Sequence, residues 1–166
     1  MERLTDRYVE ELLEVLRRRK ETVSVVESCT GGLLAARITD IPGCSDVFRQ
    51  SFVTYCDEAK HKLVKVKNAT LRKHTAVSSK TAKAMAKGGA KAAGANACVS
   101  VTGYAGPAAD ETDTSVGLVY IGCFYRGRVR VKELRLTGNR RQIRETAVDE
   151  ALRLLNEVGE FHVNGS

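Results

Sequence analysis

The sequence contains no tryptophan, and aromatic residues make up only 5% of its 166 positions. Proteins that bind single-stranded nucleic acid commonly stack the bases on aromatic side chains, so this scarcity argues against that class. No apolar run approaches the ~18 residues that a membrane-spanning helix needs. No secretory signal peptide opens the sequence either. We therefore expect a cytoplasmic protein without a membrane partner.

Metal-ligand and nucleotide-binding motifs are also missing. The five cysteines are odd in number and form no CxxC pair, and the three histidines are scattered along the chain. This pattern is typical of reduced cysteines and does not indicate a metal centre. Neither GxxxxGK[ST] nor GxGxxG occurs, which disfavours nucleoside triphosphate hydrolysis. We expect neither a metal nor a cofactor.

The composition that is present fits one compact domain. Hydrophobic residues make up 43% of the sequence and charged residues 28%, which excludes a disordered chain. A length of 166 residues leaves little room for a second domain. We therefore expect a single domain over residues 1–166, with a frayed tail at 159–166.

The net charge of +7 favours anionic partners such as phosphorylated small molecules or nucleic acid. Lys80, Lys83, Lys87 and Lys91 recur at helical spacing, and the preferred interpretation is a solvated helix face. No nucleic-acid docking motif or aromatic platform accompanies these lysines. Nucleic acid is therefore the least favoured partner, and a phosphorylated small molecule is the preferred one.

Apolar periodicity predicts helices that alternate with buried strands. Helices are expected at 4–19, 31–40, 58–66, 78–94 and 140–158. Strands are expected at 22–27, 47–56, 96–103, 116–125 and 128–136. The last two strands are expected to form a hairpin, so the central sheet should be mixed. The predicted fold is α/β, a three-layer α/β/α sandwich with a mixed central sheet.

Two predicted strands end in small polar residues, "ESCTGG" and "TGYAGP". Ligands of open α/β sheets bind beyond the carboxyl ends of the strands. The first loop also precedes a predicted helix, whose N-terminal amides attract anions. A phosphate or an oxyanion is therefore expected near Ser28, Thr30, Gly31, Gly32, Thr102 and Gly103. For Thr30 alone, an ordinary helix cap is the simpler interpretation.

A second group of candidate residues follows within sixteen positions. Ser45, Tyr55 and Lys60 combine a hydroxyl nucleophile with two side chains that can act as its base. Purely structural roles for the three residues are an alternative. Arg140 and Arg141 open the last helix, where a cation opposes the helix dipole, so an anion is a candidate partner there. A solvated pair of arginines is an equal alternative.

Six short motifs, taken together, resemble those of a known family. They are "VESCTGG" (26–32), "GCS" (43–45), "YCDEAK" (55–60), "HTAVS" (74–78), "TGYAGP" (102–107) and "GNR" (138–140). In order and spacing these motifs are similar to "AESCTGG", "GSS", "YSNEAK", "HGAVS", "TGIAGP" and "GDR" of the CinA C-terminal domain family. The resemblance covers about residues 5–157.

The resemblance implies an α/β/α sandwich enzyme that converts nicotinamide mononucleotide to nicotinate mononucleotide and ammonia without a metal. It also implies self-association as a dimer. The residues implicated by position are Ser28, Thr30, Gly31, Gly32, Ser45, Tyr55, Lys60, Thr102, Gly103 and Arg140. The chain departs from the family in the acidic loop "AADETDTSVG" (108–117), where the family usually ends in Lys-Pro-Val-Gly.

Two serines compete for the role of nucleophile. We favour Ser45, with Lys60 or Tyr55 taking its proton, while Ser28 anchors a phosphate or stabilises an oxyanion. The alternative, with Ser28 as nucleophile, remains open, and Arg140 is expected to pair with the substrate phosphate. Two other functions also remain open: a non-catalytic mononucleotide-binding or phosphate-binding module related to competence or DNA damage, and nucleic-acid binding.

Overall fold

The structure is a computed structural model that describes residues 3–108 and 112–164. Its strands are β1 (Val23–Glu27), β2 (Phe48–Val53), β3 (Ala97–Gly103), β4 (Leu118–Tyr125) and β5 (Arg128–Arg135). Its α-helices are α1 (Asp6–Arg19), α2 (Leu33–Thr39), α3 (Asp57–Val64), α4 (Asn68–His74), α5 (Ser79–Ala93) and α6 (Arg140–Gly159). A short 3-10 helix, η1 (Cys44–Asp46), precedes β2.

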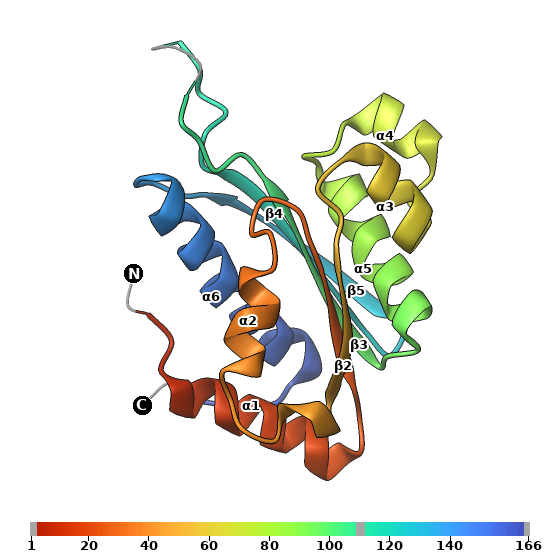
Figure 1. Cartoon of the computed structure of the whole chain (residues 1–166), viewed down its shortest axis with the longest axis vertical. Helices are drawn as coiled ribbons and strands as arrows, with labels where there is room; N and C mark the ends of the chain where they lie inside the picture. Colours follow the sequence, from red (N-terminus) through yellow and green to blue (C-terminus); the bar gives the residue numbers. More distant parts are fainter. Residues whose placement is uncertain (1–2, 109–111, 165–166) are drawn as a thin grey trace.

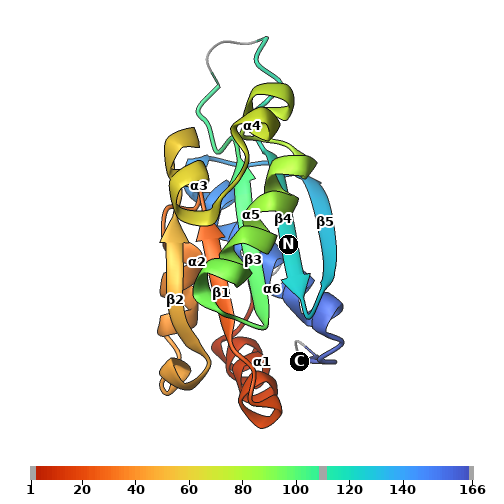
Figure 2. The same ribbon diagram turned by 90° about the vertical axis from the view of Figure 1, so that its right-hand side faces the viewer.

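The five strands form one mixed sheet in the order β2-β1-β3-β4-β5 (Figure 2). Strand β1 is parallel to β2 and to β3, whereas β4 is antiparallel to β3 and β5 is antiparallel to β4. The predicted mixed sheet and its late hairpin are confirmed. Strands β1, β2 and β3 end at the same side of the sheet, which we call the carboxyl edge.

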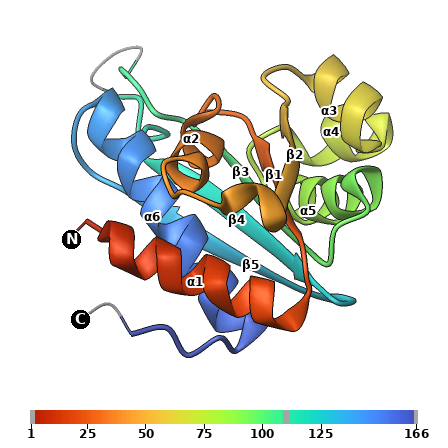
Figure 3. The same ribbon diagram turned by 60° about the horizontal axis from the view of Figure 1, so that its bottom comes forward.

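Helices cover both faces of the sheet (Figures 1 and 3). Helices α1, α2 and α6 lie on one face, and α3, α4 and α5 lie on the other. The predicted three-layer sandwich is therefore confirmed. Helix α4 is an addition to the predicted elements, and with α3 it forms a small helical unit above α5.

Strand alternation divides the core into two unequal parts. Val23 and Val25 of β1 point into the larger cluster, which includes the apolar sides of α1, α2 and α6. Val26 points the other way, into a smaller cluster with Met85 of α5 and Val64 of α3. Successive residues of β1 thus serve different layers of the fold.

Small residues bring α5 unusually close to the sheet. A Cβ on Gly89 would lie 2.3 Å from Val26 Cγ2 and 2.7 Å from Cys98 Sγ. Ser100 of β3 donates a hydrogen bond from Oγ to the carbonyl oxygen of Ala82, at 2.7 Å. The alanine- and glycine-rich composition of α5 is therefore a packing requirement.

The C-terminal segment corrects one expectation. Residues 160–164 are docked rather than frayed, since Phe161 and Val163 are only 6% and 8% exposed. Asn156 donates from Nδ2 to the carbonyl oxygen of Val163 at 2.9 Å and accepts from its amide at 3.1 Å. Two apolar side chains and this paired contact fix the segment. Residues 165 and 166 of the expected tail lie outside the described residues.

Positive charge is concentrated on one side of the molecule. Residues 57–94, which form α3, α4 and α5 and which we call the basic layer, contain ten Lys and Arg but only two Asp and Glu. The predicted lysine row of α5 is exposed: Lys80, Lys83, Lys87 and Lys91. Within this fully described segment, no Lys or Arg forms an ion pair, whereas ion pairs are frequent in α1 and α6.

No helix in the described part of the chain combines the length and the apolar character that crossing a membrane requires.

Candidate active site

The end of β1 sends consecutive side chains to opposite faces of the sheet. Glu27 is fully buried, and its carboxylate accepts hydrogen bonds from the amides of Leu34 (2.8 Å) and Ala35 (3.0 Å) at the start of α2. Ser28 points to the other face, where it meets Lys60 of α3. The abrupt change from an apolar strand to Glu-Ser therefore supplies a helix cap on one face and a hydroxyl on the other.

This arrangement corrects the predicted anion cradle at the start of α2. The carboxylate of Glu27 already occupies the first free amides of that helix. Thr30, Gly31 and Gly32 do not line the adjacent pocket. The two glycines instead adopt positive φ angles of 58° and 100°, which allow the chain to turn from β1 into α2.

Lys60 is the other member of a buried Ser–Lys pair. Its Nζ lies 3.1 Å from Ser28 Oγ and 2.8 Å from the carbonyl oxygen of Thr54, and the residue is 1% exposed. Burial lowers the pKa of the Lys60 amine, and the nearby carboxylate of Asp57 only partly opposes this effect. A lowered pKa makes the neutral amine, which can accept a proton, more accessible near neutral pH.

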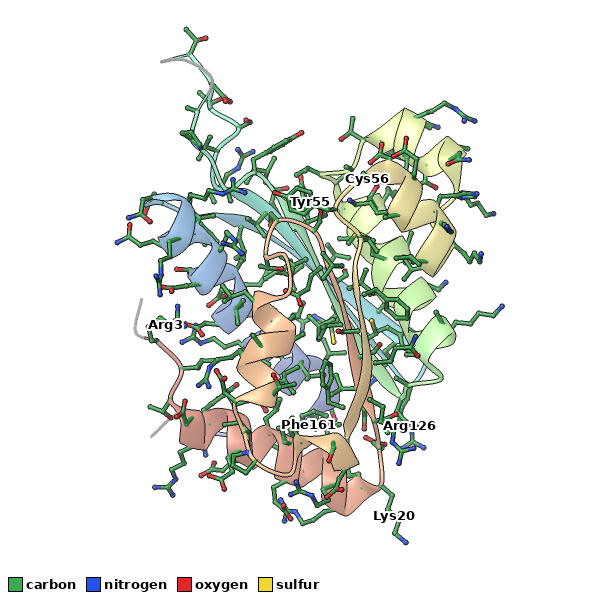
Figure 4. The ribbon with its side chains drawn as sticks, viewed as in Figure 1. Arg3, Lys20, Tyr55, Cys56, Arg126 and Phe161 are labelled. Carbon is green, nitrogen blue, oxygen red and sulfur yellow. The ribbon has the colours of Figure 1, made fainter. Side chains whose placement is uncertain are left out.

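A pocket of about 350 Å³ opens at the carboxyl edge beside this pair. It is lined by the ends of β1 and β3, the connection between α4 and α5, and residues that follow β2. Thr102 at the end of β3 donates from Oγ1 to the carbonyl oxygen of Ala76 at 2.9 Å, which ties the sheet to that connection. Figure 4 shows Tyr55 and Cys56 at this end of the molecule, beside α3.

Arg140 reaches the pocket from the N-terminus of α6. Its Nη2 donates to Tyr55 Oη at 3.1 Å, and its Nη1 donates to the carbonyl oxygen of Gly106 at 2.6 Å. Tyr55 is 60% exposed, so a ligand can contact its ring. Apart from buried Lys60, Arg140 is the cation among the described residues that line the pocket.

Cys29 also lines the pocket but is a poor nucleophile. Burial raises the pKa of its thiol to about 11, against the opposing influence of Arg144. The reactive thiolate is therefore scarce near neutral pH. Among the described residues, no group of three or more His, Cys, Asp or Glu converges to hold a metal.

Ser45 lies elsewhere, which corrects the expectation that it shares a pocket with Tyr55 and Lys60. It is exposed in η1, before the start of β2 and hence at the opposite edge of the sheet. Arg17 of α1 contacts its surroundings, donating to the carbonyl oxygen of Gly43 (3.0 Å) and to Asp46 Oδ2 (3.1 Å). Strand β2 spans the sheet between Ser45 and Tyr55, so proximity in sequence misled the prediction.

Most of the other predicted residues lie together at the pocket. The pocket brings together six of them: Ser28, Tyr55, Lys60, Thr102, Gly103 and Arg140. Sequence reasoning missed the pocket-lining Tyr104 and gave Asp113 and Ser115 no role of their own. Asp113 Oδ1 accepts from the amide of Ser115 at 2.9 Å, so these residues form a polar rim. Residues 109–111 of the altered loop lie outside the described residues.

A larger hollow, of about 450 Å³, lies between α1 and the C-terminal segment. Its lining includes Glu10, Glu14, Arg17 and Phe161 but no pair of a nucleophile and a base. We therefore place the candidate chemistry in the smaller pocket, where Ser28 and Lys60 are in contact.

Solved structures of similar proteins share the whole fold. The competence/damage inducible protein CihA of Agrobacterium tumefaciens is 35% identical, with a TM-score of 0.89 over 96% of this chain and 99% of that one. The competence damage-inducible protein A of Klebsiella pneumoniae is 32% identical, with a TM-score of 0.88 over 96% and 98%.

Curated relatives are more similar in sequence but longer. A competence-damage inducible protein of Clostridium novyi is 48% identical over 81% of this chain and 32% of its own length. One from Clostridium botulinum is 45% identical over 88% and 36%. The chain thus spans about a third of the length of these relatives. The family model for the CinA C-terminal domain matches residues 5–158, and the chain belongs to this family.

Proposed function

We propose that this chain is an amidase that hydrolyses the carboxamide of nicotinamide mononucleotide to nicotinate mononucleotide and ammonia. The observation that carries the proposal is the buried contact of 3.1 Å between Ser28 Oγ and Lys60 Nζ, two residues that line the pocket. A hydroxyl becomes a nucleophile when an adjacent base takes its proton, and a desolvated lysine is such a base.

The reaction begins when Ser28 Oγ attacks the carboxamide carbon and its proton passes to neutral Lys60. Lys60 then returns this proton to the amide nitrogen, the C–N bond breaks and ammonia leaves. Water hydrolyses the resulting ester in the same way, with Lys60 as base, and nicotinate mononucleotide is released from Ser28. The overall change adds one water and releases one ammonia. Ser28 therefore replaces Ser45 as our proposed nucleophile.

The rest of the pocket supports a phosphorylated substrate with an aromatic ring. Arg140 supplies a guanidinium for the phosphate, since its fork geometry suits phosphate oxygens. Tyr55 and Tyr104, both exposed at the pocket, offer ring faces for stacking. Tyr55 Oη accepts a hydrogen bond from Arg140, so the proposed phosphate-binding group and a proposed stacking ring are in direct contact.

The test is an ammonia-release assay on purified protein with nicotinamide mononucleotide, with the product acid identified by chromatography. Nicotinamide and its riboside serve as substrates without the phosphate. We expect ammonia from the mononucleotide, little from the two analogues, and none from Ser28→Ala. Absence of ammonia from the wild-type protein under all pH and metal conditions would refute the proposal.

A second candidate is a binding module that retains the pocket without turnover. The altered loop at 108–117 motivates it: Asp113 of this loop lines the pocket, so the departure from the family sequence lies beside the proposed Ser–Lys pair. Calorimetry with nicotinamide mononucleotide distinguishes the two functions. Tight binding without ammonia release would select the binding module, and turnover would select the amidase.

A further inference from the structure

Arg144 holds the loop that follows Ser28 from behind. It lies one helical turn after Arg140 on α6, on the face of the sheet opposite α3 and Lys60. Its Nε donates to the carbonyl oxygen of Cys29 at 3.0 Å, and its Nη2 donates to that of Thr30 at 2.8 Å. Arg144 does not line the pocket itself.

One rigid group therefore fixes two consecutive peptide units. A peptide is planar, so fixing the direction of its carbonyl also fixes the direction of the following N–H. The N–H of Gly31 accordingly donates back to the carbonyl oxygen of Ser28 at 3.0 Å, which closes a tight turn on that residue. The guanidinium fork suits this task because its donors are coplanar and permanently charged.

The surroundings of Arg144 leave this contact as its main polar role. The neighbouring Glu145 pairs with Arg3 and Arg141 instead. Among the described residues, Arg144 has no carboxylate partner within ion-pair distance. A Cβ on Gly31 would lie 3.6 Å from Arg144 Nη2, so the loop passes directly over the guanidinium.

We propose that Arg144 is a positioning residue for the reaction: it fixes the backbone after Ser28 so that Ser28 Oγ stays in contact with Lys60 Nζ. The inference rests on the proposed function for its chemistry, but its geometry concerns the activation of Ser28 alone. Small displacements of a nucleophile lower rates steeply, by up to about 100-fold for 1 Å. Arg144 thus acts on turnover rather than on substrate binding.

The experiment compares Arg144→Met, Arg144→Lys and Arg144→Ala with the control Arg141→Met, which removes an exposed arginine from the same helix. Steady-state kinetics give kcat and KM, and thermal unfolding gives Tm. A fluorophosphonate probe measures the reactivity of Ser28 by intact-protein mass spectrometry. In that labelling, the serine oxygen bonds to phosphorus, fluoride leaves and the hydroxyl proton passes to Lys60.

We expect Arg144→Met to lower kcat about 10–100-fold while KM changes by less than about threefold. The labelling rate should fall in parallel. Arg144→Lys should remain impaired, because one ammonium cannot reproduce the fork, and Arg141→Met should match the wild type. Millimolar guanidinium added to Arg144→Ala should restore part of the labelling rate, a result that lost folding would not give.

If Arg144→Met folds and keeps the wild-type kcat and the wild-type labelling rate of Ser28, the inference is overturned. The labelling readout also separates it from the proposed function. If the wild-type protein releases no ammonia but Ser28 is labelled in a Lys60-dependent and Arg144-dependent way, only the substrate is wrong. If the labelling rate of Ser28 does not change when Arg144 is substituted, the positioning role is refuted. It is also refuted if the wild-type protein shows neither turnover nor labelling.

Discussion

Glu27 and Ser28 are adjacent in the chain, yet their side chains serve different layers of the sandwich. The carboxylate of Glu27 caps α2, and the hydroxyl of Ser28 contacts Lys60 of α3. Strand alternation makes this division possible, since successive side chains of a strand point to opposite faces. Substitutions at the two positions should therefore have separable effects on stability and on chemistry.

Glu27→Gln tests the structural half of this division. The amide keeps one acceptor for the start of α2 but turns an NH2 group toward a second backbone donor in a fully buried site. We expect a loss of about 1–3 kcal/mol in the free energy of unfolding. Urea unfolding measures it, with the exposed Glu10→Gln of α1 as the control. Equal stability of the two variants would contradict the capping role.

Ser28→Ala and Ser45→Ala test the proposed chemical role of Ser28. Ser28→Ala should lower kcat by about a thousandfold or more, because it removes the proposed nucleophile. Ser45→Ala should leave kcat within about twofold of the wild type, because Ser45 lies at the other edge of the sheet. Kinetics of ammonia release give both values. A collapse of activity in Ser45→Ala would reverse our choice of nucleophile.

The pH dependence of turnover reports on Lys60. Burial lowers its pKa, and only the neutral amine accepts the proton of Ser28. We expect kcat/KM to rise with pH and to level off once the pH exceeds this lowered pKa. Lys60→Arg, whose side chain stays charged, should abolish activity across the range. A profile that falls with rising pH from 6 to 9 would exclude Lys60 as the base.

Lys60 should also affect stability in a pH-dependent way. Its pKa is lower in the folded than in the unfolded chain, so the folded state loses the proton first as the pH rises. The cost of burying the charge is thus complete below the folded pKa and disappears toward the unfolded pKa. The Tm of Lys60→Met relative to the wild type should therefore increase as the pH falls.

Thermal unfolding between pH 6 and 10 measures this difference. The control is Lys87→Met, which removes a lysine from the exposed face of α5. The loss of the hydrogen bond from Lys60 to the carbonyl oxygen of Thr54 lowers the stability of Lys60→Met at every pH, so the slope carries the test. A Tm difference that does not vary with pH would contradict a lowered pKa.

The cysteines should differ sharply in reactivity. Cys56 is exposed at the start of α3, whereas Cys29 is buried and the pKa of its thiol is raised to about 11. Iodoacetamide at pH 7.5 should therefore alkylate Cys56 and spare Cys29. Peptide mapping by mass spectrometry reads this directly. Retained activity in Cys29→Ala would further exclude a thiol nucleophile, and rapid alkylation of Cys29 would contradict its burial.

Much of the fold could be predicted from the sequence because local patterns agree with the tertiary structure. The apolar residues of α1 recur on one side of a helix, which predicts an amphipathic helix. The β-branched run of β1 predicts a buried strand. Helix α4 escaped prediction because Leu71 is its single buried side chain, so it has almost no periodic signal. The docking of Phe161 likewise depends on a distant surface and not on its neighbours in sequence.

Most of the residues that line the site could be predicted from the sequence, but the serine that contacts Lys60 could not. The residues at the ends of β1 and β3 were correctly brought together by the rule that parallel strands end at one edge. The choice between Ser28 and Ser45 required knowing that β2 carries the chain from one edge to the other. Nothing in the sequence indicated a role for Arg144, because its hydrogen-bond partners are backbone carbonyl oxygens.

The concentration of uncompensated lysines in α3, α4 and α5 gives the molecule a strong electric dipole. This segment carries a formal charge of +8, whereas the remainder of the chain carries about −1. An anion that approaches in dilute buffer will be drawn toward the half of the protein that contains Lys60. Small phosphorylated compounds should consequently reach the pocket beside Ser28 and Lys60 more often than uncharged compounds of the same size, and added salt should remove that difference.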